Sequence, residues 1–161
     1  MAYCSELEER LEVKNFIDRL EQEFDRSDYS KNLKNSLNHL RKIKLFLYRE
    51  WDQWKPLSEE TMLDSTDCLS LVTIVHLLAS RKGIDTTIVR PKNLSRYFHA
   101  MLSYESENGA DIFKVAGRYR KYDCLSMGVD QVERRIKYIR PLVNLVNSFR
   151  FGNNVLSYSH Q

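Results

Sequence analysis

The sequence predicts an α+β fold: an N-terminal helical hairpin, then a buried helix followed by a small antiparallel sheet, and finally a C-terminal helix. Three observations predict this class. Apolar residues recur every three or four positions over the first third of the chain, an almost wholly apolar stretch follows, and β-branched or alternating runs come after it. One core of ordinary size suits 161 residues with 42% hydrophobic content, so we expect a single domain over 1–161.

The helical hairpin is predicted over residues 5–55. From Leu7 to Phe24, apolar residues recur at helical intervals with charged residues between them, which is typical of an amphipathic helix. After a polar break at 25–30, a second apolar series steps by four and three from Leu33 to Trp54 and ends before Pro56. The stripes also suit pairing with a partner helix, but packing on the domain's own core is the simpler interpretation.

The buried helix is predicted over residues 65–83, within a core that extends over 57–117. Its apolar residues leave hardly any polar face, so we expect other elements to enclose it on most sides. Ser65 or Thr66 can cap its N-terminus, and Gly83 can take the left-handed conformation that ends a helix.

Three strands are predicted after this helix, over 84–90, 97–105 and 111–116. Each run is β-branched or alternates between apolar and polar residues. Asn108 and Gly109 suit a hairpin connection, so the last two strands are expected to be antiparallel neighbours.

The C-terminal helix is predicted over 129–150, after a stretch at 118–128 that shows no clear period and is expected to be loop. Pro141 lies inside this helix and should bend it or divide it in two. The tail at 152–161 is polar.

Composition restricts the compartment more than the function. Three cysteines at wide spacings do not resemble a secreted disulfide framework, and no stretch has the character of a signal peptide or of a membrane-spanning helix. We therefore expect a cytoplasmic protein that does not enter a membrane. A net charge of +3 decides little about partners.

Cys68 is the first candidate catalytic residue. It lies in the first turn of the buried helix, where unpaired backbone N–H groups and the helix dipole favour a thiolate. His99, in the second predicted strand, can act as its general base. A cysteine in an apolar helix is usually a core residue, and that alternative stays open for Cys68 on these residues alone.

These residues also carry a resemblance. Asp67-Cys68 opening a buried helix, Gly83-Ile84 in the turn after it, and His99-Ala100 entering a strand are similar to the core of the transglutaminase-like superfamily. The match covers about residues 65–117. The resemblance implies a papain-like Cys-His-Asp arrangement and chemistry through a thioester, either hydrolysis of a peptide or protein amide or transfer of its acyl group to an amine.

The third member of that arrangement departs from the family. The aspartate that usually closes the strand after His-Ala is replaced by Ala116 and Gly117. Asp111 is expected at the wrong end of its strand, which leaves Asp123 folding back, or Asn108 or a backbone carbonyl orienting the ring.

The other candidate sites are weaker. A metal site built from Cys68, His76, His99 and Cys124 has none of the closely spaced pairs that zinc sites use, and His76 is expected to be a core histidine with a hydrogen-bond partner. No glycine-rich phosphate loop and no Gly-x-Ser-x-Gly turn occurs. We therefore expect neither a metal nor a cofactor.

A second class of function is a non-catalytic interaction module that keeps the fold. The segment from Lys114 to Arg140 contains eight basic and three acidic residues. This basic segment can bind a polyanion or an acidic protein. A solvated charged surface is the ordinary interpretation of such a run, and nucleic acid is the less favoured partner. The candidate binding residues are Trp51, Trp54, Arg118, Arg120 and Lys121.

Overall fold

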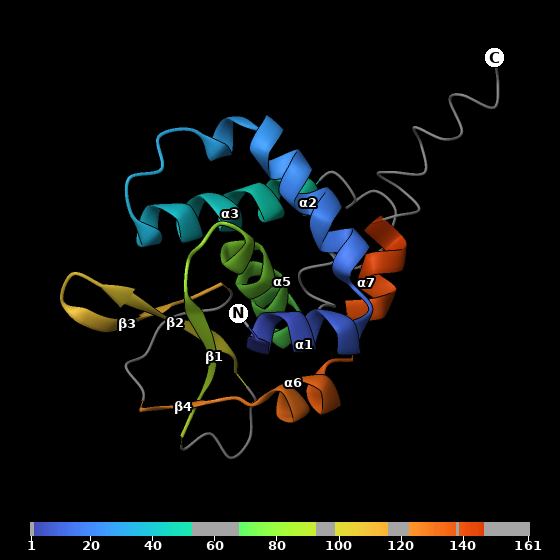
Figure 1. Cartoon of the computed structure of the whole chain (residues 1–161), viewed down its shortest axis with the longest axis vertical. Coiled ribbons are helices and arrows are strands. Elements are labelled where there is room, and N and C mark those ends of the chain that lie inside the picture. The colour runs from blue at the N-terminus through green and yellow to red at the C-terminus, as the bar shows by residue number, and fades with distance from the viewer. Residues whose placement is uncertain (1, 53–67, 93–98, 116–122, 138, 147–161) are drawn as a thin grey trace.

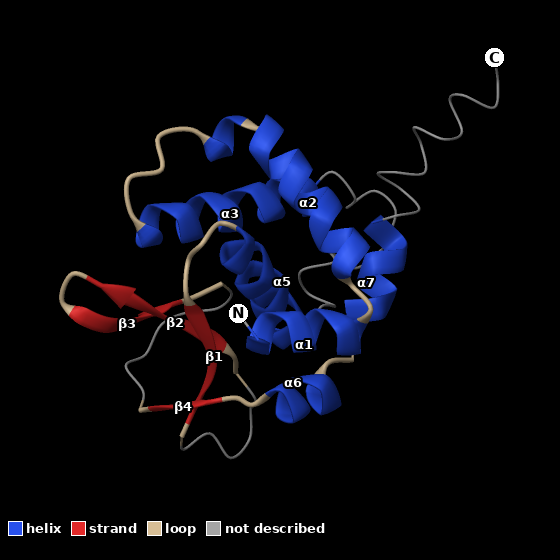
Figure 2. Cartoon of the chain, viewed as in Figure 1, coloured by secondary structure: helices blue, strands red, loops and turns tan. Residues whose placement is uncertain are grey.

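A computed structural model describes residues 2–52, 68–92, 99–115, 123–137 and 139–146, and confirms the α+β class. Helices gather against one side of a small twisted sheet (Figures 1 and 2). The N-terminal elements are α1 (Ala2–Leu11), α2 (Lys14–Arg26), the short 3-10 helix η1 (Asp28–Ser30) and α3 (Ser36–Asp52). They are followed by α5 (Cys68–Arg81), β1 (Thr86–Pro91), β2 (Met101–Ser106), β3 (Gly109–Phe113), β4 (Cys124–Ser126), α6 (Val129–Arg135) and α7 (Ile139–Val146).

Helix α5 is the centre of the fold, as the sequence predicts. Every residue from Leu69 to Ala79 is buried, and α5 contacts α1, α2, α3, β1 and β2 (Figure 1). An all-round apolar helix requires this enclosure because it has no face to offer to water. Gly83, at φ +73°, ends the helix as expected, with its N–H donating to Ser80 O. The predicted caps Ser65 and Thr66 lie outside the described residues.

The sheet has the order β3-β2-β1-β4, with antiparallel neighbours throughout. Thr86 is opposite Tyr104 in the β1–β2 pair, and Leu102 is opposite Phe113 in the β2–β3 pair. The predicted hairpin between the last two expected strands is confirmed, with Gly109 at φ +100°. One face packs its apolar side chains into the same core as α5, which is where Ile88, Ala100 and Leu102 lie.

The first predicted helix is in fact two helices, because the chain turns at Glu12. Glu12 has φ 56°, in the left-handed region, and Val13 is buried next to it. Leu11 and Val13 are two residues apart, so one continuous helix cannot bury both on the same face. The break lets α1 and α2 each turn an apolar side toward α5.

Two corrections concern the C-terminal part. The expected loop at 118–128 contains β4, which pairs with β1 through Pro91 and Cys124. The predicted helix over 129–150 is divided into α6 and α7, and the break comes at Ile136, before Pro141. Pro141 is the third residue of α7, where a missing N–H costs no helical hydrogen bond. Among the described residues, no helix has both the length and the apolar character needed to cross a membrane.

A cluster of ion pairs connects the C-terminal end of α5 to α1 and α2. Arg81 lies 3.1 Å from Glu8 and 2.6 Å from Asp18, and its neighbour Lys82 lies 3.2 Å from Glu21. Glu8 is only 8% exposed, so its carboxylate depends on Arg81 for compensation. Two cations at the C-terminus of a helix also interact favourably with its dipole.

Replacing Arg81 with Met should therefore destabilise the fold strongly. The substitution keeps much of the side-chain volume but leaves Glu8 as a nearly buried, unpaired carboxylate. We expect the free energy of unfolding to fall by roughly 2 to 4 kcal/mol, measured by urea denaturation at neutral pH. The control is Lys31→Met, which removes the exposed pair with Asp28 and should lower the free energy of unfolding much less than Arg81→Met does. Equal losses in the two variants would contradict a special role for Arg81.

Candidate active site

The predicted nucleophile and base, Cys68 and His99, lie at the same end of the unit formed by α5 and the sheet. The chain reverses at Gly83, so the end of β1 returns toward the start of α5, where Cys68 is the first residue. Strand β2 begins there too, because Met101 is opposite Val89. Within the described residues, however, the Nε2 atom of His99 makes no hydrogen bond to Cys68.

His99 itself has an unusual environment. Its Nε2 atom is buried and has no hydrogen-bond partner within the described residues. Burial and the nearby Lys114 ammonium both lower the pKa of His99, so its ring favours the neutral form. Ala100 packs into the core beside α5, and alternation continued by one residue places His99 toward the opposite face of the sheet. The Cys68–His99 pair stays a prediction.

The structure does not bring Asp123 next to His99. Lys92 N–H donates to Asp123 O across the β1–β4 edge, at 2.7 Å, whereas His99 precedes β2 on the other side of β1. Two strand spacings, about 10 Å, therefore separate the two backbones. Asn108 lies in the β2–β3 turn, at the far end of β2 from His99, and Asp111 is opposite Tyr104 near that same end. Neither Asn108 nor Asp111 is therefore close enough to orient the His99 ring.

The side chains of the predicted binding residues all lie outside the described part of the chain. Trp54, Arg118, Arg120 and Lys121 lie outside the described residues, and Trp51 belongs to α3 with its side chain outside them.

A different cysteine and histidine are in contact. The Cys4 Sγ atom, on α1, lies 3.2 Å from Nε2 of His76 on α5. The other ring nitrogen, Nδ1 of His76, lies 2.7 Å from Oγ1 of Thr86 on β1. Helix α1 and the two consecutive elements α5 and β1 thus build a Cys-His-Thr chain, in which Thr86 fixes the orientation of the ring. A thiol within reach of an imidazole that a third group orients is the general arrangement of an activated nucleophile.

The environment of His76 keeps its ring neutral. His76 is 1% exposed, and burial lowers its pKa from 6.5 to about 4, although the Asp85 carboxylate acts in the opposite direction. The Tyr3 ring packs edge-on against the imidazole, with centroids 5.4 Å apart, and the Tyr3 hydroxyl donates to Met127 O. Burial raises the pKa of Tyr3 to about 12, so this hydroxyl stays protonated. At pH 7 the His76 ring in this contact is therefore neutral.

Cys4 also faces an open cavity of about 430 Å³. Its volume is within the range of small-molecule sites. Ser5, Glu8 and Glu9 line it from α1, Ser80 and Arg81 line it from α5, and Lys14 completes it. Cys4 is half-buried and lines this cavity, whereas His76 is buried.

The sequence predicts only half of this arrangement. A core histidine with a hydrogen-bond partner is expected at residue 76 and is confirmed. Cys4 carried no usable signal, because 72 residues separate it from His76 and no motif links them. Among the described residues, no group of three histidine, cysteine, aspartate or glutamate side chains is placed to hold a metal ion.

Comparison with known proteins adds no family. No protein-family model, no curated protein and no solved structure matches the chain. The function must therefore be inferred from the geometry alone.

The buried ring of His76 should make stability depend on pH. The unfolded chain binds a proton at this histidine below pH 6.5, but the folded chain does so only near pH 4, so protonation favours unfolding. The stabilisation is complete above pH 6.5 and should fall by up to about 3 kcal/mol as the pH drops through 4. Urea denaturation of the wild type and His76→Gln between pH 7 and pH 4 measures it.

The contribution of His76 is the difference in the free energy of unfolding between the wild type and His76→Gln at each pH. His99 also has a lowered pKa and acts in the same direction, but it is present in both proteins and cancels. A difference that does not change between pH 7 and pH 4 would contradict the prediction.

Proposed function

We propose that the protein is a cysteine-dependent hydrolase or acyltransferase that acts on an amide or ester through a thioester, with Cys4 as the nucleophile. The observation that carries the proposal is the 3.2 Å contact between Cys4 Sγ and His76 Nε2 at the wall of an open cavity. His76 is the general base and Thr86 is the residue that positions it.

The reaction can be written with the groups present. The Cys4 sulfur bonds to the substrate carbonyl carbon as its proton passes to Nε2 of His76, and the carbonyl π pair moves onto oxygen. That oxyanion can accept from the N–H groups in the first turn of α1, which have no acceptor within the helix. Collapse breaks the bond to the leaving amine or alcohol, which takes the proton from His76. Water or an amine then attacks the thioester and regenerates the thiol.

The neutral His76 ring sets a condition on this chemistry. Because burial disfavours the imidazolium, the ring accepts the proton as the carbon–sulfur bond forms rather than beforehand. The Thr86 hydroxyl can accept from Nδ1–H, which leaves Nε2 with its lone pair toward Cys4. Thr86 therefore selects the tautomer that can act as a base.

A second thiol is proposed for the same class of reaction. Cys68 opens α5, and His99 lies at the same end with a buried Nε2 atom that lacks a partner in the described part of the chain. This pair agrees with the sequence pattern but has no described contact. The two proposals differ in which cysteine reacts and in which histidine it depends on.

Because the chain has three cysteines, one alkylation experiment can test both proposals. We expect iodoacetamide at pH 7 to alkylate Cys4 fastest, as located by peptide mass spectrometry, with a rate that falls roughly a hundredfold in His76→Gln. Cys124 is the internal control, since burial and Asp123 raise its pKa. Thr86→Val, which keeps the side-chain volume, should slow Cys4 as well without affecting Cys124.

The outcomes separate the interpretations. If Cys68 reacts fastest and depends on His99, tested with His99→Gln, the nucleophile is the second proposal. If no cysteine exceeds Cys124, the alternative of a non-catalytic interaction module replaces both. Activity is then tested with the model ester p-nitrophenyl acetate. It should release one equivalent of nitrophenolate in a burst and leave the acetyl group on Cys4.

A further inference from the structure

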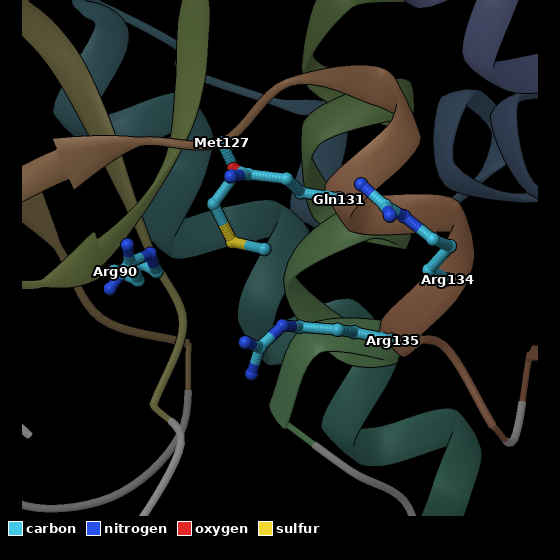
Figure 3. A pocket seen from close by; sticks show the side chains of 5 residues that line it. All are labelled: Arg90, Met127, Gln131, Arg134 and Arg135. Atoms are coloured by element: carbon cyan, nitrogen blue, oxygen red, sulfur yellow. The ribbon is translucent and has the colours of Figure 1, made fainter. Parts of the chain in front are cut away.

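A second cavity, of about 300 Å³, lies between the sheet and α6 and is lined by three arginines. Arg90, on β1, forms one side, and Arg134 and Arg135 extend from α6 on the other (Figure 3). Met127 lies between them, and Gln131 completes the wall (Figure 3). Met127 is 2% exposed and is the one apolar side chain among the described residues that line the cavity.

The arginines of α6 are separated from the acidic residues of the same helix. Asp130 and Glu133 both pair with Arg10 of α1, which turns them away from the cavity. Arg134 uses its Nε atom to donate to Asp130 O, at 3.1 Å, a contact with backbone rather than with a carboxylate. None of the described residues that line the cavity is acidic. The described lining residues therefore carry three positive charges and no negative charge.

The chemistry of these groups favours a phosphate. A guanidinium presents its N–H donors in a planar fork that matches two phosphate oxygens, and the cavity has Arg90 on the β1 side and Arg134 and Arg135 on the α6 side. The cavity exceeds what a bare phosphate needs, and Met127 offers an apolar contact to whatever carries it. A cavity of about 300 Å³ suits a small molecule better than the long charged groove that tracks a polynucleotide.

We propose that this arginine pocket, defined by Arg90, Met127, Gln131, Arg134 and Arg135, binds a small organic phosphate monoester. The phosphate lies among the three guanidinium groups and its organic group lies against Met127. This site is distinct from the Cys4 cavity, and no residue lines both. The inference therefore does not depend on the thiol chemistry.

The probe is phenyl phosphate, titrated into the full chain by calorimetry at low and at physiological salt. We expect it to bind more tightly than inorganic phosphate, which lacks the apolar group, and than phenol, which lacks the charge. Arg90→Gln and Arg134→Gln should each weaken binding roughly tenfold or more, because each removes charge-assisted hydrogen bonds. Both variants must first show wild-type unfolding curves.

Lys137→Gln is the matched control, because it removes one positive charge near the same end of α6 from a residue that does not line the pocket. Its affinity for phenyl phosphate should stay within threefold of the wild type. An equal loss in Lys137→Gln and Arg134→Gln would reduce the effect to net charge and overturn the proposal. Failure of phenyl phosphate to bind, together with binding of an oligothymidylate that has no terminal phosphate, would identify a polynucleotide surface instead.

Discussion

The rest of the structure depends on the complete burial of α5. A helix that is apolar on every side must be enclosed, and three helices and two strands meet on its surface to do so. The turn at Glu12 follows from this requirement, because it lets α1 and α2 approach α5 along separate directions. The ion pairs of Arg81 then fix the end of the central helix to both of them.

The same enclosure creates the polar features of the core. A buried helix can carry a polar side chain only when a neighbour satisfies it. Thr73 donates to Leu69 O one turn earlier in its own helix, whereas His76 reaches outward to Thr86 on the sheet and to Cys4 on α1. A buried imidazole in contact with a half-buried thiol is thus a product of how α1 and β1 cover α5.

The two cavities differ in chemistry and share a structural neighbour. The Cys4 cavity is lined by residues of both charges, whereas the described residues of the arginine pocket are three arginines, a glutamine and the apolar Met127. Tyr3 connects their walls: its ring packs on His76, and its hydroxyl donates to the carbonyl oxygen of Met127. Tyr3 therefore fixes the position of α1 relative to the segment that leads into α6.

The sequence by itself determined the elements whose signal is local. Periodicity and turn residues predicted α3, α5 and the β2–β3 hairpin, because helix and strand periods and glycine conformations depend on near neighbours. Only the tertiary structure decided the turn at Glu12, the short strand β4, the contact of Cys4 with His76 and the cavity that Arg90 shares with the α6 arginines. These depend on which surfaces meet across long sequence separations, and burial, which no short window of sequence contains, selects them.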